Sequence, residues 1–337
     1  MIKTLIVDDS PLVRTIIRDF LESDGSFHIV GEAENGLDGV NKAQQLNPDL
    51  ITMDIEMPVM NGLEAIENIK KSMSAAIVVI TTVDTAKMAY EATVKGALEF
   101  YPKDLFTSQM SEQKQQEILD TLKHIASIKG KDSAQQDSES EVRIASRQIN
   151  CVVIASSTGG PQAISQLCTF LPREFPVPVV LVQHNTSGFD RGFVQWLDGC
   201  TNFRVHLVEE HMVPVKGMLY VAPTDKHLLM SATGFLFDNG EPVHNQKPAA
   251  DVLFKSAADL YGESLVSVVL TGMGCDGAEG TQYVRQAGGI TIAQDEATSM
   301  IYGMPQAAAE TGCVDMVLSL EDIANQLISL TKGNNEI

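Results

Sequence analysis

The sequence alternates short apolar runs with amphipathic stretches of helical length, and it does so in two blocks, residues 1–125 and residues 149–332. Such alternation is typical of strand-helix units, in which parallel strands form a sheet that helices cover on both faces. In the first block the predicted strands are 2–7, 27–33, 49–54, 75–82 and 97–103, and the predicted helices lie near 11–22, 36–46, 61–71, 85–95 and 107–128. This pattern predicts a five-stranded parallel sheet.

The second block has more strands and one segment that breaks the alternation. The predicted strands lie near 151–155, 177–183, 203–208, 217–221, 265–271, 289–293 and 315–318, and the predicted helices lie near 161–170, 188–199, 250–261, 276–287, 305–311 and 320–331. The segment LYVAPTDKHLLMSATGFLFDN has the pattern of a hairpin, so we expect a doubly wound, mostly parallel α/β sheet that is mixed at one edge. Residues 126–148 are polar and poor in large apolar side chains, which predicts a flexible linker between two domains.

Composition excludes several classes of protein. The chain has 337 residues, 44% of them hydrophobic, without an apolar run of membrane-spanning length, and its start becomes acidic too early for a signal peptide. We therefore expect a cytoplasmic protein without direct membrane insertion. The five cysteines are scattered and form no Cys-x-x-Cys pair, so we expect reduced thiols and neither disulfides nor a zinc site.

The charge of the chain argues against a nucleic-acid partner. The net charge is −20; residues 1–147 contain 15 Lys and Arg against 24 Asp and Glu, and residues 148–337 contain 9 against 20. Phosphate contacts need a basic face, which the second half can hardly assemble. This balance disfavours a transcription factor.

Acidic side chains follow two of the first five predicted strands. Asp8 and Asp9 follow the first strand and Asp54 follows the third, so all three fall at the carboxyl edge of the sheet, where such folds bind ligands. Carboxylates and a phosphoryl group are ligands that suit Mg²⁺. Thr81 and Lys103 end two further strands, and both are able to hold phosphoryl oxygens on Asp54. The alternative is a set of acidic residues that are merely solvated.

The motifs VDDS, MDIEMP, NG, VVITT and FYPK resemble those of two-component receiver domains, over residues 1–125. The resemblance implies a flavodoxin-like fold in which a histidine kinase phosphorylates Asp54. It also implies that Asp8, Asp9 and the backbone carbonyl of Glu56 position Mg²⁺ together with Asp54.

The same resemblance implies that Thr81 and Phe100 form a switch pair beside Lys103. One difference from the family follows the lysine, because Asp104 stands where the family usually has a proline in a cis peptide. A cis peptide that lacks proline costs about 2.5–4 kcal/mol.

The second block begins with CVVIASSTGG, residues 151–160, a buried strand that runs into two serines and a glycine pair. Pro161 then begins a helix, whose free N–H groups are donors for a developing negative charge. Ser157 is the candidate nucleophile. A phosphate-binding turn or a simple tight turn is the alternative at this level.

A nucleophilic serine needs a base and a carboxylate that orients the base. His184 follows the predicted strand VVLVQ and so lies at the same sheet edge as Ser157, whereas His227 is the second choice. Asp276 lies in a glycine-rich loop, GMGCDG, which also presents N–H groups near Met273. The order Ser-His-Asp and the absence of a Gly-x-Ser-x-Gly motif exclude the α/β-hydrolase arrangement.

The motifs ASSTGGP, QH, YVAP, DVLF, LTGMGCDGAEG and AQDEATSMIYGMP resemble the catalytic domain of the chemotaxis protein-glutamate methylesterases, over residues 149–332. The resemblance implies hydrolysis of glutamate methyl esters on the cytoplasmic helices of chemoreceptors, deamidation of receptor glutamines, and activation by phosphorylation of the receiver. It implies that Ser157 is the nucleophile, His184 the base and Asp276 the orienting acid, with the N–H groups of Thr158 and Met273 as oxyanion donors.

Two differences from this family leave alternatives open. Ala155-Ser156 stands where the family commonly has Gly-Ala, which places a rival hydroxyl next to Ser157, and Asn185-Thr186 follows the histidine where the family usually has Met-Pro. Neighbouring residues at a strand end point to opposite sides, which favours Ser157. A receptor-binding adaptor without catalysis remains the alternative function.

Overall fold

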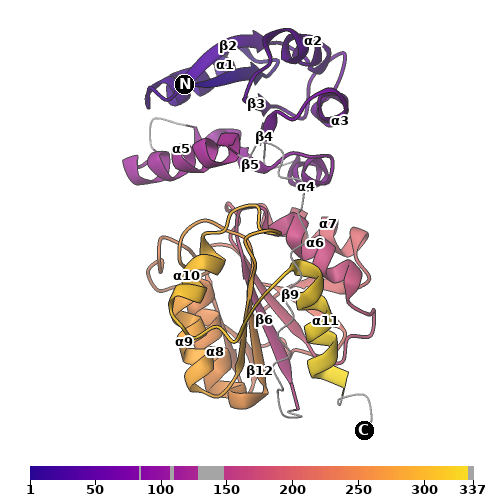
Figure 1. The fold of residues 1–337 in the computed structure, drawn as a ribbon, viewed down its shortest axis with the longest axis vertical. Coiled ribbons are helices and arrows are strands. Elements are labelled where there is room, and N and C mark those ends of the chain that lie inside the picture. Colours follow the sequence, from indigo (N-terminus) through magenta and orange to yellow (C-terminus); the bar gives the residue numbers. More distant parts are fainter. Residues whose placement is uncertain (83–84, 107–109, 128–147, 333–337) are drawn as a thin grey trace. The chain divides into compact units, whose positions relative to one another are not determined.

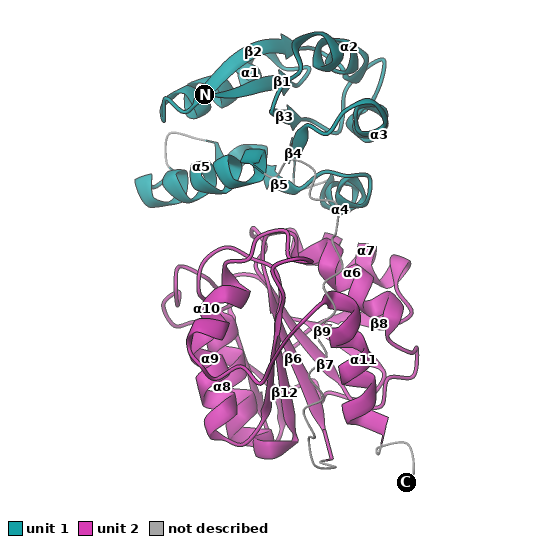
Figure 2. Cartoon of the chain, in the orientation of Figure 1, with its two compact units in different colours: residues 1–132 teal, residues 133–337 magenta. Residues whose placement is uncertain are grey.

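The computed structural model describes residues 1–82, 85–106, 110–127 and 148–332. The chain divides into two compact units, residues 1–132 and residues 133–337 (Figure 2). Residues 128–147, most of the predicted linker 126–148, lie outside the described residues, while Ala126 and Ser127 end a helix.

Unit 1 is a five-stranded parallel sheet with the order β2-β1-β3-β4-β5, as predicted. Its elements are β1 (Ile2–Val7), α1 (Pro11–Glu22), β2 (Phe27–Ala33), α2 (Gly36–Leu46), β3 (Leu50–Met53), α3 (Gly62–Ser72), β4 (Ala76–Thr81), α4 (Ala86–Val94), β5 (Glu99–Pro102), the short 3₁₀ helix η2 (Lys103–Leu105) and α5 (Glu112–Ser127).

The sequence of unit 1 explains where its helices begin and which faces they bury. Ser10, Asn35 and Asn61 each accept a hydrogen bond from a first-turn N–H, so they cap α1, α2 and α3. Residues of α1 and α5, including Ile17 and Ile118, pack in one core with the sheet. β3 and β4 are buried throughout, as expected for strands that helices cover on both faces.

Unit 2 contains a seven-stranded sheet with the order β14-β13-β12-β6-β7-β9-β8 and a separate two-stranded sheet. Its elements are β6 (Cys151–Ser156), α6 (Gly160–Phe170), β7 (Val179–Gln183), α7 (Asp190–Cys200), β8 (Arg204–Leu207), β9 (Met218–Val221), β10 (His227–Ser231), β11 (Gly234–Asp238), α8 (Ala250–Tyr261), η3 (Gly262–Ser264), β12 (Leu265–Val269), α9 (Ala278–Gln286), β13 (Ile290–Gln294), α10 (Met304–Glu310), β14 (Met316–Leu318) and α11 (Leu320–Thr331).

The expectation of a mixed sheet edge is wrong. Every strand pair of the seven-stranded sheet is parallel, and the hairpin of β10 and β11 forms a sheet of its own. The hairpin packs against α8 instead, where Met230 N–H donates to Ser256 Oγ at 3.1 Å. Its apolar residues Leu228 and Phe235 join the core that contains residues of α8. This contact with a helix buries the apolar face of a two-stranded hairpin, which is marginally stable alone.

The arrangement of unit 2 brings three loops to one place. In Figure 1, α8, α9 and α10 cover one face of the large sheet, and α6, α7 and α11 cover the other. Strand β6 lies between β12 and β7 in the sheet, so the segments that follow these three strands are neighbours at the carboxyl edge. None of the described helices is both long enough and apolar enough to span a membrane.

Candidate active site and phosphoacceptor site

The two neighbouring serines at the end of β6 have different surroundings. Ser156 is completely buried, and its hydroxyl donates to Gln183 Oε1 at 2.6 Å. Gln183 Nε2 in turn donates to the backbone oxygens of Ser157 and His184, at 3.0 and 3.1 Å. The Ser156 hydroxyl is therefore part of the packing below the site, whereas Ser157 is only partly buried and lies at its surface.

Close backbone packing holds Ser157 in position. Its N–H donates to the Thr271 carbonyl at 3.0 Å, which joins the end of β6 to the loop after β12. A Cβ atom on Gly272 would lie 2.7 Å from Ser157 Cβ and would also collide with Met304 Sδ, so this position requires glycine. Gly159, with φ of +76°, supplies the left-handed turn that leads into α6.

His184 follows β7, and its backbone N–H donates to the Ser156 carbonyl at 2.9 Å, at the strand end that carries Ser157. The ring is buried, and its Nε2 lies 2.7 Å from Asp276 Oδ2. The other ring nitrogen, Nδ1, is buried and has no hydrogen-bond partner within the described residues. Because Nε2–H donates to the carboxylate, Nδ1 carries the lone pair, and it is the nitrogen that is able to accept a proton.

Asp276 is held by the start of a helix as well as by the histidine. Oδ2 accepts the Ala250 N–H at 2.7 Å, and Oδ1 accepts the Asp251 N–H at 3.0 Å, both from the first turn of α8. Burial disfavours the charged carboxylate, but the hydrogen bonds from His184 and from these N–H groups outweigh it and lower the pKa of Asp276. The carboxylate is therefore a permanently charged partner for the imidazole.

Asp251 makes the reciprocal contact with the next helix. Its Oδ1 accepts the N–H groups of Gly277 and Gly280, at 2.9 and 2.6 Å, at the start of α9. Burial, with a contribution from Asp276, raises the pKa of Asp251 to about 6. Asp276, which precedes α9, thus binds the N-terminus of α8, and Asp251, in the first turn of α8, binds the N-terminus of α9. Together the two contacts fix the loop that carries Asp276.

His227, the second candidate for the base, has a structural role. It is buried, its Nε2 donates to the Glu241 carbonyl at 2.9 Å, and its Nδ1 accepts the Ala249 N–H at 3.2 Å. Both ring nitrogens are occupied, so His227 has no nitrogen left for a serine.

The predicted oxyanion donors come from two segments of unit 2. Thr158 lies in the turn between β6 and α6, and its N–H donates no hydrogen bond within the described part of the chain. Met273 follows Gly272 in the loop after β12, the loop that contacts Ser157.

The carboxylates predicted in unit 1 come together at the carboxyl edge of its sheet. Asp8, Asp9 and Asp54 each offer an oxygen within 4.8 Å of the others; Asp8 and Asp54 are buried, and Asp9 is exposed. Lys103 Nζ lies 2.7 Å from Asp8 Oδ2 and 2.7 Å from Asp54 Oδ2. Burial raises the pKa of Asp54, and the bond to Lys103 offsets this only in part.

The remaining predicted residues of unit 1 surround this cluster less directly. The Thr81 hydroxyl is buried and lies 2.8 Å from the Thr85 hydroxyl. Phe100 is buried with its ring edge-on to Tyr90, at a centroid distance of 4.7 Å. Glu56 has an exposed side chain in the loop after Asp54.

Backbone geometry around Asp54 and Lys103 adds two details. A Cβ atom on Gly62 would collide with the Asp54 carbonyl, so the Asn61-Gly62 pair allows α3 to begin against this strand end. The Lys103–Asp104 peptide is trans, because the described residues contain a single cis peptide, Lys247–Pro248.

Sequence reasoning missed Gln183 and Asp251 as members of the site. Gln183 lies in the motif QH and Asp251 in the motif DVLF, but neither motif by itself indicates which side chain the residue contacts. The position of Gln183 directly before the candidate base, and of Asp251 at the start of a predicted helix, were the two features that could have indicated a role.

Comparison with known proteins agrees with both blocks of the chain. The model of the CheB methylesterase family matches residues 152–327, and the model of the response regulator receiver domain matches residues 4–114. A curated protein-glutamate methylesterase/protein-glutamine glutaminase of Clostridium acetobutylicum is 37% identical over 98% of both chains, and one of Thermotoga maritima is 34% identical, also over 98% of both.

A solved structure agrees with unit 2. The crystal structure of the Thermotoga maritima CheB methylesterase catalytic domain is 37% identical in sequence, with a TM-score of 0.53; the match covers 55% of this chain and all of that one. The family models and the full-length relatives together show that the chain belongs to the CheB family of receiver-linked protein-glutamate methylesterases.

Proposed function

We propose that this protein is a phosphorylation-activated hydrolase that demethylates glutamate methyl esters, and deamidates glutamines, on the cytoplasmic helices of chemoreceptors. The observation that carries the proposal is the His184 ring, which binds Asp276 through Nε2 and keeps a buried Nδ1 without a partner in the described residues, while the His184 backbone pairs with the end of β6. A serine hydrolase needs a base that a carboxylate orients in this way. Ser157 Oγ makes no hydrogen bond to Nδ1 here, and catalytic hydrogen bonds of this kind are often formed only when substrate is bound.

In the proposed reaction, His184 Nδ1 takes the proton of the Ser157 hydroxyl while Oγ attacks the ester carbonyl. The N–H groups of Thr158 and Met273 donate to the oxyanion, and each such donor is worth roughly 3 kcal/mol of transition-state stabilisation. The imidazolium then protonates the leaving methanol, or ammonia when the substrate is a glutamine amide. Water, deprotonated by the same nitrogen, releases the glutamate from Ser157.

Asp276 stabilises the imidazolium that forms in each half of the reaction. The lowered pKa of Asp276 keeps the carboxylate charged, and the N–H groups of α8 hold it in place. The His184 ring is therefore already oriented before the reaction begins. The triad therefore needs no cofactor for the ester chemistry.

Unit 1 supports a phosphoacceptor role for Asp54. We propose that a histidine kinase supplies the phosphoryl group, that Asp8, Asp9, Asp54 and the Glu56 carbonyl hold Mg²⁺, and that Thr81 and Lys103 contact the phosphoryl oxygens. The three clustered carboxylates suit a hard divalent cation, which when bound neutralises charge on the transferred group. Thr81 and Phe100 are the proposed switch pair.

The test is mass spectrometry of a methylated chemoreceptor cytoplasmic fragment after incubation with the purified full chain. We expect methyl esters to become acids and receptor glutamines to become glutamates, and both conversions to accelerate with a small-molecule phosphodonor and Mg²⁺. Binding of the fragment without conversion would contradict the proposal and would favour an adaptor.

A further inference from the structure

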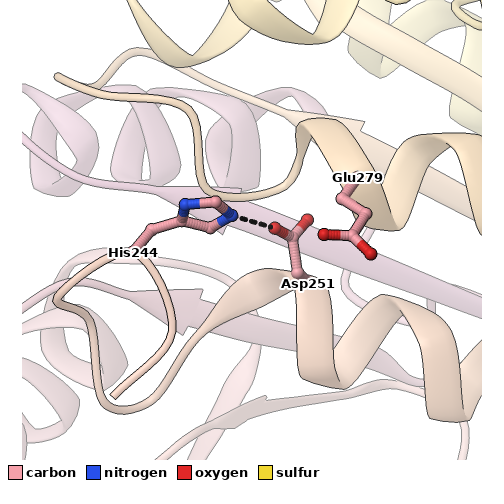
Figure 3. A group of neighbouring side chains, drawn as sticks. All are labelled: His244, Asp251 and Glu279. Carbon is pink, nitrogen blue, oxygen red and sulfur yellow. Dashed lines mark ion pairs between the residues drawn. The ribbon is translucent and has the colours of Figure 1, made fainter.

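A second group of polar side chains is joined to Asp276 through Asp251, whose N–H donates to Asp276 Oδ1. His244 comes from the loop before α8, Asp251 from the first turn of α8 and Glu279 from the first turn of α9 (Figure 3). Each residue offers one imidazole nitrogen or carboxylate oxygen, and these atoms lie within 4.8 Å of one another. His244 and Glu279 are exposed, whereas Asp251 is buried.

The two oxygens of Asp251 have different surroundings. Oδ1 accepts the two N–H groups at the start of α9, but Oδ2 is buried and accepts no hydrogen bond from the described residues. The Asp251 side chain is only 7% exposed, and Oδ2 lies 3.1 Å from His244 Nε2. A buried carboxylate oxygen is costly unless a positive charge balances it, and here either a protonated His244 or a bound cation supplies that charge.

The other face of His244 is also occupied. Its Nδ1 lies 3.6 Å from the Cys275 sulfur, which is able to accept the Nδ1–H. Nε2 faces Asp251 Oδ2 at 3.1 Å, where either a proton or a metal ion satisfies both atoms. Metal-binding histidines characteristically have their second nitrogen fixed by a neighbouring group, and a metal ion that binds here displaces the proton.

We propose that His244, Asp251 and Glu279 form a binding site for a divalent transition-metal ion of the Zn²⁺ class. One imidazole nitrogen and two carboxylate oxygens suit such an ion better than Mg²⁺, which prefers the all-oxygen cluster of unit 1. The ligand atoms lie up to 4.8 Å apart, so the exposed side chains of His244 and Glu279 must rotate toward a common centre when the ion binds. Water completes the coordination on the exposed side.

The proposed metal site is in direct contact with the proposed triad. The Asp251 N–H donates to Asp276 Oδ1, and the Gly277 N–H donates to Asp251 Oδ1. A metal ion on Asp251 therefore joins the loop before α8 to the first turn of α9 and stiffens the segment that carries Asp276. The inference does not depend on the identity of the ester substrate.

The test is calorimetric titration of the full chain with Zn²⁺, in excess Mg²⁺ so that the carboxylates of unit 1 are occupied. Co²⁺ is a second probe, because its visible absorption reports nitrogen and oxygen ligands. The variants are His244→Asn, since asparagine tolerates the φ of +51° at this position, and Glu279→Gln. His211→Asn is the matched control, because His211 is also exposed and has a φ of +66°.

We expect the wild type and His211→Asn to bind one Zn²⁺ with equal affinity, and His244→Asn and Glu279→Gln to bind it at least tenfold more weakly. The Co²⁺ absorption and the Zn²⁺-induced rise in the Tm of unfolding should fall in the same two variants. Equal Zn²⁺ affinity in the wild type and both variants, or no binding by the wild type, would overturn the proposal and leave a simple His244–Asp251 ion pair. If either variant fails to fold, the other still decides.

Discussion

The two units use a buried aspartate at the carboxyl edge of a parallel sheet in opposite ways. Asp54 and Asp276 are 4% and 2% exposed, yet the pKa of the first is raised and that of the second is lowered. Burial disfavours the charge of both. The difference comes from their partners, because Asp276 receives two N–H groups from the start of α8 and a third hydrogen bond from His184.

Asp54 has a looser set of partners. Oδ1 accepts its neighbour's N–H, from Ile55 at 2.8 Å, and Oδ2 is held by the long side chain of Lys103. A lysine side chain is able to move away when a phosphoryl group arrives, whereas the backbone of a helix is not. This difference is consistent with the proposed roles, in which Asp54 reacts and Asp276 orients another residue.

The largest expected effect concerns the base itself. His184→Gln removes the buried ring nitrogen, Nδ1, that has no partner in the described residues and that is the proposed base. The rate of methanol release should fall by a factor on the order of 10⁵–10⁶. Methanol release from methylated receptor measures this directly.

The matched control is His227→Gln, because both nitrogens of His227 are bound to the backbone. Its free energy of unfolding should fall by about 1–3 kcal/mol in denaturant titrations, while the folded protein retains its activity. Comparable loss of rate in both variants of the folded protein would argue that His227 takes part in the chemistry.

The next effect tests the oriented carboxylate. Asp276→Asn keeps the shape and one oxygen acceptor for α8, but it removes the charge that stabilises the imidazolium. We expect kcat to fall by roughly 10³–10⁴-fold with little change in KM. A loss of less than tenfold in steady-state assays would mean that His184 does not depend on this carboxylate.

A smaller effect is expected from backbone crowding next to the nucleophile. Gly272→Ala places a Cβ 2.7 Å from Ser157 Cβ, so the serine must shift, and a displacement of this kind costs on the order of 10²-fold in rate. Gly199→Ala is the control, because no atom lies within 4 Å of its added Cβ. Equal kcat in the wild type and Gly272→Ala would show that the position of Ser157 is not critical.

The smallest effect on the ester chemistry belongs to the other unit. In Asp54→Asn the ratio of rates with and without phosphodonor should fall to one, since the amide does not accept a phosphoryl group. Asp24→Asn is a suitable control, because Asp24 pairs with Lys123, outside the carboxylate cluster. Phosphodonor stimulation that persists in Asp54→Asn would exclude Asp54 as the acceptor.

Much of the fold was predictable because its signals are local. Helix α11 has the predicted bounds, 320–331, and the strands of both sheets lie within a few residues of their predicted positions, since buried parallel strands are continuous apolar runs. The separate β10–β11 sheet was not predictable. Its hairpin pattern predicts the local pairing, but whether a hairpin joins a larger sheet depends on tertiary packing against α8.

Strand-end positions predicted where the candidate site residues lie along the sheet, but not what supports them. The structure joins His184 to Asp276, and Ser157 lies at the end of β6, which neighbours both β12 and β7 in the sheet. The structure favours Ser157 over Ser156 because the Ser156 hydroxyl is bonded to Gln183. The hydrogen bond from Asp251 to Asp276 joins residues that are 25 positions apart in the sequence. Such side-chain partners depend on three-dimensional distances that no local pattern encodes.

The most direct test of the central claim compares the two adjacent serines. Methanol release from methylated receptor is measured with the wild type, Ser157→Ala and Ser156→Ala, after each is shown to be folded. The account predicts that Ser157→Ala loses the activity, whereas Ser156→Ala, which loses only a buried hydrogen bond to Gln183, keeps most of it. Activity that survives in Ser157→Ala and disappears in Ser156→Ala would contradict the account.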